Sequence, residues 1–144
     1  MNRLSYPAII EYVVEDENFT VEFPDLQGCI TYGDTLEDAK NYAKEALSAF
    51  LASMFDNGFK IPEPSGVKGE NVYLIEPEPY AAVPILLRKL RNEFGYSQTD
   101  VSKKLGIAYQ VYQKLENPNK CNPTVKTLEK IACIYNKHLH LEIA

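Results

Sequence analysis

The net charge of this chain changes sign near its middle, and this change constrains the possible folds more than any other feature of the sequence. Residues 1–80 contain 15 Asp and Glu against 5 Lys and Arg, a net charge of −10. Residues 81–144 contain 10 Lys and Arg against 5 Asp and Glu, a net charge of +5. Because nucleic acid attracts basic side chains and repels carboxylates, the two halves cannot share one polyanionic partner. We therefore expect two domains with different partners.

The boundary between the two domains is predicted from proline. Pro77, Pro79 and Pro84 lie close together where the charge changes, and such a stretch is typical of a linker. The expected domains are residues 1–76 and 82–144. The sequence contains no apolar run of about 18 residues and no secretory leader. We expect a cytoplasmic protein with no membrane partner.

The first half alternates apolar side chains as strands do and then changes to the period of a helix. Residues 6–14 and 19–23 flank an acidic turn and predict a hairpin, and residues 29–32 predict a third short strand. The apolar face of the hairpin would comprise Tyr6, Ala8, Ile10, Tyr12, Val14, Phe19, Val21 and Phe23. A helix capped by Asp34 or Thr35 would cover that face. A strand at 71–77 follows, which makes the order β-β-β-α-β.

The second half is predicted to be helical until its end. The apolar period indicates helices at 85–94, from Ser97 to a turn at Gly106, at 108–117 and at 124–136. Ser97 and Asp100 have the spacing of a capping box. The last residues, LHLEIA, alternate with a period of two and predict a short terminal strand.

Two short helices joined at a glycine, in a basic segment, are typical of a helix-turn-helix. The segment LLRKLRNEFGYSQTDVSKKLGIAYQVYQKLENPNKCNPTVKTLEKIACIY resembles the Cro/C1-type (Xre) helix-turn-helix family over about fifty residues. The resemblance implies binding to double-stranded operator DNA. It assigns DNA contacts to Ser97, Gln98, Tyr109, Gln110, Gln113, Lys114 and Lys120. It also assigns flanking phosphate contacts to Lys103 and Lys104. It also implies a structural ion pair between Arg91 and Glu116.

The acidic half is similar to another family. YPAIIEY, then FPDLQGCITYGDTLEDAKNYAKEAL, then IPEPS resemble HicB-type antitoxins. The resemblance implies an α+β chain in which a reduced RNase H-like β-β-β-α-β domain precedes the all-α helix-turn-helix domain. It implies a partner as well, a HicA-like small basic ribonuclease toxin. The sequence leaves the toxin-binding residues unknown, with Glu11, Glu22 and Asp25 as candidates.

The function expected from both resemblances is that of a type II antitoxin. Such a protein would neutralise an mRNA-cleaving toxin and repress its own operon. Because a terminal strand has no obvious partner in a helical domain, Leu139, Leu141 and Ile143 are expected to pair with a second copy. We expect a homodimer or a tetramer.

Two other functions remain open from the residues alone. One is a stand-alone repressor whose acidic domain senses a small molecule. The other is a metal-dependent nuclease that uses Glu11, Glu22 and Asp25, although these alternate with apolar residues as solvent-facing side chains do. The spacing of Cys121, Cys133, His138 and His140 matches no common zinc site. We therefore expect no enzyme, no catalytic residue, no metal and no cofactor.

Overall fold

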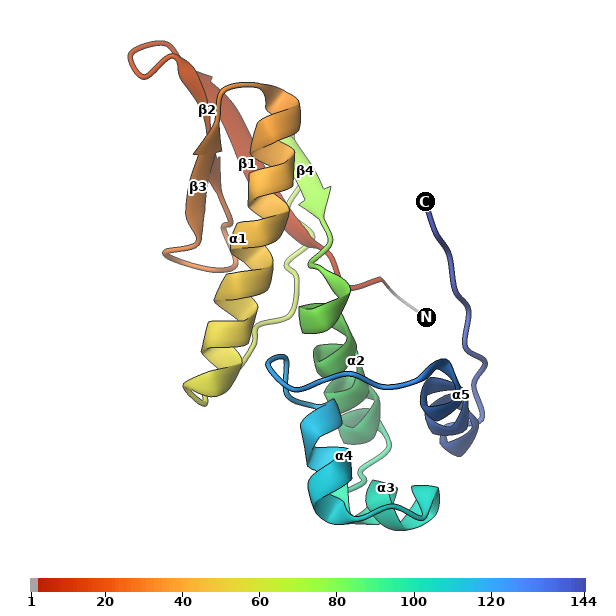
Figure 1. Cartoon of the computed structure of the whole chain (residues 1–144). Coiled ribbons are helices and arrows are strands. Elements are labelled where there is room, and N and C mark those ends of the chain that lie inside the picture. The colour runs from red at the N-terminus through yellow and green to blue at the C-terminus, as the bar shows by residue number, and fades with distance from the viewer. Residues whose placement is uncertain (1–2) are drawn as a thin grey trace. The chain divides into compact units, whose positions relative to one another are not determined.

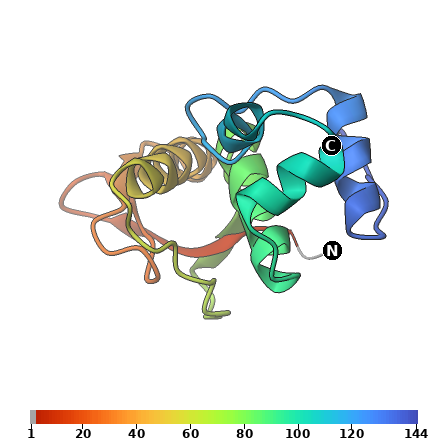
Figure 2. The same cartoon turned by 90° about the horizontal axis from the view of Figure 1, so that it is seen from below.

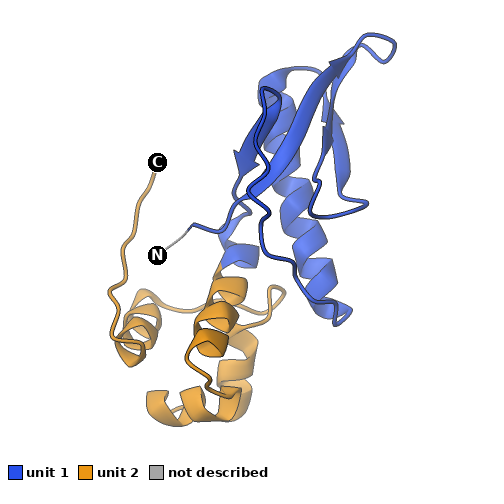
Figure 3. Ribbon diagram, turned by 180° about the vertical axis from the view of Figure 1, so that it is seen from behind, with its two compact units in different colours: residues 1–82 blue, residues 83–144 orange. Residues whose placement is uncertain are grey.

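The chain divides into two compact units, residues 1–82 and 83–144, which Figure 3 shows in blue and orange. The structure is a computed structural model and describes residues 3–144. None of the helices in this part of the chain is long and apolar enough to cross a membrane.

The first unit contains one antiparallel sheet. Its central strand β1 (Tyr6–Val13) pairs with β2 (Asn18–Glu22) on one side and with β4 (Val72–Ile75) on the other. Strand β3 (Ile30–Gly33) pairs with β2, so that the order is β3-β2-β1-β4. The two edges of the sheet are therefore β3 and β4.

One long helix, α1 (Leu36–Asp56), lies along one face of this sheet, as Figures 1 and 2 show. The Thr35 side chain caps it by accepting a hydrogen bond of 3.0 Å from the backbone N–H of Asp38. The core between helix and sheet is formed by buried residues that include Ala8, Ile10, Val21, Ala39, Ala43, Leu47 and Leu51. Full burial of each large aliphatic side chain contributes about 1.5–3 kcal/mol. The predicted order β-β-β-α-β is therefore present.

The helix approaches β3 most closely at Gly33. A Cβ atom added there would lie 2.5 Å from the backbone nitrogen of Ala39 and 2.8 Å from its Cα. Because both of those atoms belong to the backbone, no side-chain movement can relieve the contact. Glycine is therefore required where β3 meets the first turn of α1.

The prediction that the helix covers the whole apolar face of the hairpin is wrong at the far end of that face. Tyr6, Ala8 and Ile10 are buried, but Tyr12 is 53% exposed and Val14 is 74% exposed. The tip of the hairpin projects past α1 in Figure 1, so α1 does not cover these two side chains. The Tyr12 ring instead packs edge-on against Phe19, with ring centroids 5.2 Å apart.

The proline stretch between the halves is helical rather than an extended linker. Helix α2 (Pro79–Glu93) begins in the first unit and ends in the second, six residues earlier than the helix predicted at 85–94. Pro79 is its first residue, where a missing N–H costs nothing because that group has no helical acceptor. Pro84 lies inside the helix and removes one backbone hydrogen bond. The linker prediction is therefore wrong for residues 79–84.

The second unit is a small helical core. After α2 come α3 (Gln98–Leu105), α4 (Tyr109–Leu115) and α5 (Val125–Ile134). Its buried cluster draws on each of these helices and comprises Leu87, Val101, Tyr112, Leu115, Ile131 and Tyr135.

The predicted terminal strand is not formed in the single chain. Residues 137–144 contain neither helix nor strand, and Leu141 and Ile143 are 64% and 102% exposed. A strand exists only when another strand accepts and donates its backbone hydrogen bonds, and the sheet described above ends at β3 and β4. The fold of one chain thus lacks the short terminal strand expected from the alternation.

Candidate nucleic-acid interface

Helices α3 and α4 are joined by a tight turn that the sequence encodes locally. The Ser97 Oγ accepts a hydrogen bond of 3.0 Å from the Asp100 N–H, and the Asp100 carboxylate accepts one of 2.8 Å from the Ser97 N–H. This bond from the Ser97 backbone lowers the pKa of Asp100. Gly106 ends α3 at φ 70° and ψ 33°, a left-handed conformation that glycine adopts without strain. The turn then leads directly into α4.

Helix α4 has one buried face and one exposed polar face. Tyr112 and Leu115 point into the core and are 0% and 7% exposed. The side chains on the other face are exposed, and the predicted DNA contacts among them are Tyr109, Gln110, Gln113 and Lys114. Amide and ammonium groups on one helix face can hydrogen-bond base edges in a major groove. Val111, which is 50% exposed, belongs to the same surface and was not among the predicted DNA contacts.

The structure brings Arg91 and Glu116 together, one from α2 and the other from the end of α4. Arg91 donates from Nε to Glu116 Oε2 at 2.7 Å and from Nη2 to Oε1 at 2.9 Å. Its third nitrogen donates to the backbone carbonyl of Tyr96 at 3.0 Å. The Glu116 side chain is fully buried and that of Arg91 is 14% exposed. This bidentate pair ties α4 to α2 and to the start of α3.

A second arginine approaches the same carboxylate. Arg88 Nε lies 3.7 Å from Glu116 Oε1, and Arg88 is one helical turn before Arg91. The resemblance to the helix-turn-helix family implied Arg91 alone, although the spacing of three residues could have indicated both.

The pKa values agree with a charged pair. Burial raises the pKa of Glu116, but the hydrogen bond from Arg91, the Arg91 charge and the other polar neighbours together outweigh it, so that the pKa of this carboxyl lies below its ordinary value. The same hydrogen bond raises the pKa of Arg91. Burial lowers the pKa of Arg88, because desolvation disfavours its charged form. Glu116 is consequently a carboxylate at neutral pH.

Gln98 connects this ion pair to the exposed face of α4. Its Nε2 donates to Glu116 Oε1 at 3.4 Å, and its Oε1 accepts a hydrogen bond from the Tyr109 hydroxyl at 3.1 Å. Ser97, as described above, uses both its hydroxyl and its N–H to cap α3. The structure therefore gives these two predicted DNA contacts intramolecular partners and leaves Gln110, Gln113 and Lys114 as the exposed polar groups of α4.

Exposed lysines surround the helix-turn-helix. Lys103 and Lys104 occupy the last turn of α3, and the Lys104 ammonium lies 4.9 Å from the centre of the Tyr96 ring. Lys120 is exposed in the loop after α4. Such side chains can contact phosphates on either side of a recognition helix.

The three candidate toxin-binding carboxylates lie in the first unit and do not converge. Glu11 and Glu22 are exposed on β1 and β2, opposite Thr20 and Ile9 respectively. Asp25 lies in the connection after β2, where its Oδ2 accepts a hydrogen bond of 2.9 Å from the Ser65 N–H. Within residues 3–144, no group of three or more His, Cys, Asp or Glu could hold a metal ion.

Comparisons with known proteins match each half of the chain to a family. Residues 6–87 match the family described as HicB-like antitoxin of bacterial toxin-antitoxin system, and residues 87–141 match the helix-turn-helix family. The chain is 27% identical to Antitoxin HicB 1 of Photorhabdus laumondii over 99% of its own length and 89% of that protein. It is 28% identical to the HTH-type transcriptional regulator SinR of Bacillus subtilis, over 38% of this chain and 49% of SinR. One chain of a solved HicA3 and HicB3 toxin-antitoxin complex is 29% identical to this chain, with a TM-score of 0.40. The match covers 52% of this chain and 99% of the solved one.

Proposed function

Because the chain belongs to the HicB-like antitoxins of bacterial toxin-antitoxin systems, we propose that it neutralises a small basic mRNA-cleaving toxin and represses its own operon. Membership of this family confirms the resemblance predicted from the sequence, and so does the match of the second half to the helix-turn-helix family. The proposal rests on one observation, which is that a single chain contains both an acidic HicB-like unit and a basic helix-turn-helix.

The DNA half of the proposal rests on the exposed face of α4. Gln110 and Gln113 would contact adenine in the major groove, and Lys114 would contact guanine or a phosphate. Lys103, Lys104 and Lys120 would contact phosphates on either side. Tyr109 would lie at the edge of the groove while its hydroxyl stays bonded to Gln98. Residues 82–144 thus form the proposed DNA-binding domain.

Two copies of the chain would be needed to read an operator. A two-fold dimer places two recognition helices about one DNA turn apart. We propose that Leu139, Leu141 and Ile143 pair with the same segment of a second copy, which would satisfy a backbone that has no strand partner in one chain. Deleting residues 139–144 should then abolish the dimer in sedimentation at micromolar concentration.

The toxin half rests on residues 1–76, a reduced RNase H-like domain in this proposal. This domain would act in the cytoplasm as a binding protein, not as an enzyme, because Asp25 lies off the sheet with its carboxylate hydrogen-bonded to the Ser65 N–H, whereas Glu11 and Glu22 lie on β1 and β2. A net charge of −10 over residues 1–80 favours a basic partner. An acidic surface competes with RNA for the same basic side chains of a ribonuclease.

Co-expression with whatever short protein is encoded beside this chain tests both halves. The full chain should co-purify with that protein, suppress its RNA cleavage and retard the DNA upstream of the two genes. A chain that binds this DNA but not the neighbouring protein would be a stand-alone repressor. Cleavage of RNA by the chain alone, in magnesium or manganese, would contradict the antitoxin function.

A further inference from the structure

One edge of the sheet is exposed and apolar. Strand β3 is an edge strand of four residues that contains no charged side chain, and its outward-facing Ile30 and Tyr32 are 67% and 64% exposed. Soluble proteins usually protect such edges with lysine, proline or a covering segment, because an open edge pairs readily with other strands. The opposite edge, β4, also lacks charged side chains and leaves Leu74 67% exposed, but the Lys40 ammonium lies 4.4 Å from the centre of its Tyr73 ring.

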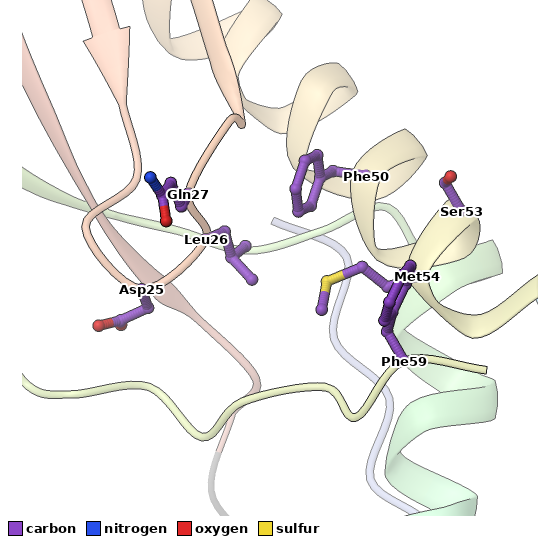
Figure 4. A pocket seen from close by; sticks show the side chains of 7 residues that line it. All are labelled: Asp25, Leu26, Gln27, Phe50, Ser53, Met54 and Phe59. Atoms are coloured by element: carbon purple, nitrogen blue, oxygen red, sulfur yellow. The ribbon is translucent and has the colours of Figure 1, made fainter. Parts of the chain in front are cut away.

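A groove reaches the open edge at the start of β3, between α1 and the connection that precedes this strand. Its first hollow, at the start of β3, has a volume of about 290 Å³ and is lined by Gly28, Cys29, Ile30, Ala46, Ala49 and Phe50. A second hollow of about 310 Å³ shares Phe50 and continues along Leu26, Gln27, Met54 and Phe59. Figure 4 shows Leu26, Phe50 and Met54 pointing toward one another, whereas the Asp25 carboxylate points away from them. The two hollows together form one apolar groove beside a free strand edge.

Small residues leave this groove open on the helix side. Side chains of an added strand would alternate between the two faces of the sheet, so every second one would enter the groove. Ala46 and Ala49 present only methyl groups there, and Gly28 presents none. The edge and the groove thus suit a strand that pairs its backbone with β3 and inserts alternate side chains beside α1.

Charge identifies the kind of strand that would fit. The lysines of α1 lie on the flank toward β4, where Lys40 covers Tyr73 and the Lys44 ammonium lies 3.9 Å from Glu78. The groove flank has carboxylates instead. Glu45 is four residues before Ala49 and Asp56 is three residues after Ser53, so each is a helix neighbour of a residue that lines the groove. A basic segment would be attracted to this flank, whereas a second copy of a unit with a net charge of −10 would be repelled.

We propose that the groove between β3 and α1, here called the β3 groove, binds an extended basic segment of the toxin as an added strand. This inference rests on the proposed antitoxin function and names the surface that performs it. The added strand extends the sheet beyond β3, and its apolar side chains contact Ala46, Ala49 and Phe50. Its basic side chains lie near Glu45 and Asp56. Glu11 and Glu22, on β1 and β2, are then not the main toxin contacts.

A charge added inside the groove, compared with the same charge added outside it, tests the inference. Ala49→Arg places a bulky cation on the groove side of α1, while Asn41→Arg places one at another exposed position of the same helix. Both variants should fold, because both positions are exposed and arginine favours helices. With the full chain and the neighbouring basic protein, Ala49→Arg should weaken binding by about tenfold or more. Asn41→Arg should leave it within about twofold, as expected of a charge at the periphery of an interface.

Hydrogen exchange of the same complex provides the second measurement. Complex formation should protect the amides of residues 30–33 and leave those of the β4 edge, residues 72–75, unchanged. Equal weakening by the two variants, or protection at β4 alone, would overturn the groove while the antitoxin function stands. Protection of β3 in the chain alone that rises with its concentration would assign the edge to a second copy. Absence of any complex with the unmodified chain would overturn both proposals.

Discussion

The two units present their candidate binding surfaces in different ways. In the helix-turn-helix unit, the exposed groups of α4 follow one another within a few residues, and a capping box, a glycine turn and an ion pair position the helix. In the sheet unit, the β3 groove is built from residues 25–30 and 46–59, which become neighbours only when α1 packs on β3. A surface of the first kind is encoded in a short motif. A surface of the second kind is a product of tertiary packing.

The largest expected effect would follow from removing the ion pair. In Glu116→Ala the Arg91 charge would lose its buried partner, which costs about 3–5 kcal/mol. Hydrogen exchange in the full chain should therefore accelerate at the amides of α3 and α4, while those of β1 keep their protection. Glu129→Ala, at an exposed position of α5, is the matched control. Unchanged protection of α4 would mean that the ion pair does not position this helix.

The corresponding position in the sheet unit is Gly33. Gly33→Ala would place a methyl carbon against the backbone of Ala39, and such overpacking costs about 1–3 kcal/mol. Exchange should accelerate in β1, β2 and β3 and remain unchanged in α3 and α4. Gly69→Ala is the control, because an added Cβ there meets only the Val72 side chain, at 3.4 Å. If both substitutions had equal effects, the close approach of α1 to β3 would not be what orders this unit.

A smaller effect is expected for DNA recognition. Gln110→Ala should weaken operator binding by about 1–3 kcal/mol and leave binding to random duplex unchanged. Lys103→Ala should weaken both equally, since a phosphate contact carries no sequence information. Gln27→Ala removes an exposed glutamine from the sheet unit and should change neither. Titrations of the two duplexes at one salt concentration measure all three, and a loss for Gln110→Ala on both duplexes would make Gln110 a backbone contact.

Acid should weaken the helical unit through Glu116, with an effect smaller than that of Glu116→Ala. The folded pKa of Glu116 lies below its ordinary value of 4.5, so its contribution to stability is complete above that value. The contribution is lost as the pH falls from 4.5 through the folded pKa, because protonation neutralises the carboxylate. The exchange protection of α4 should therefore fall between neutral and acidic pH. In Glu116→Gln this part of the pH dependence should disappear, and its persistence would assign the acid sensitivity to other groups.

Much of the architecture could be predicted from the sequence because its determinants are local. The acidic turn of the hairpin, the Thr35 cap and the change of hydrophobic period lie within short segments, and each corresponds to an element of the structure. The glycine turn at 106 and the capping box of Ser97 are equally local.

The remaining features depend on groups that are distant in sequence or belong to another molecule. The exposure of Tyr12 follows from where α1 begins relative to the hairpin, and Pro84 is fully buried inside α2. The β3 groove could not be predicted, because neither Gly28 nor Ala49 indicates by itself that the other is near. A strand at Leu141 requires a second backbone.

The contact between Gly33 and Ala39 also determines the register of the edge strand. If β3 slid by one residue along β2, Tyr32 or Asp34 would occupy the position where no Cβ fits. Because β3 cannot slide, a strand added to its free edge would meet the backbone of residues 30–33 in one fixed register. A partner segment would then bind in one register, and a toxin segment whose side chains are displaced by one residue would not fit. In a bacterium with several similar toxin-antitoxin pairs, this fixed register would make each antitoxin specific for its own toxin.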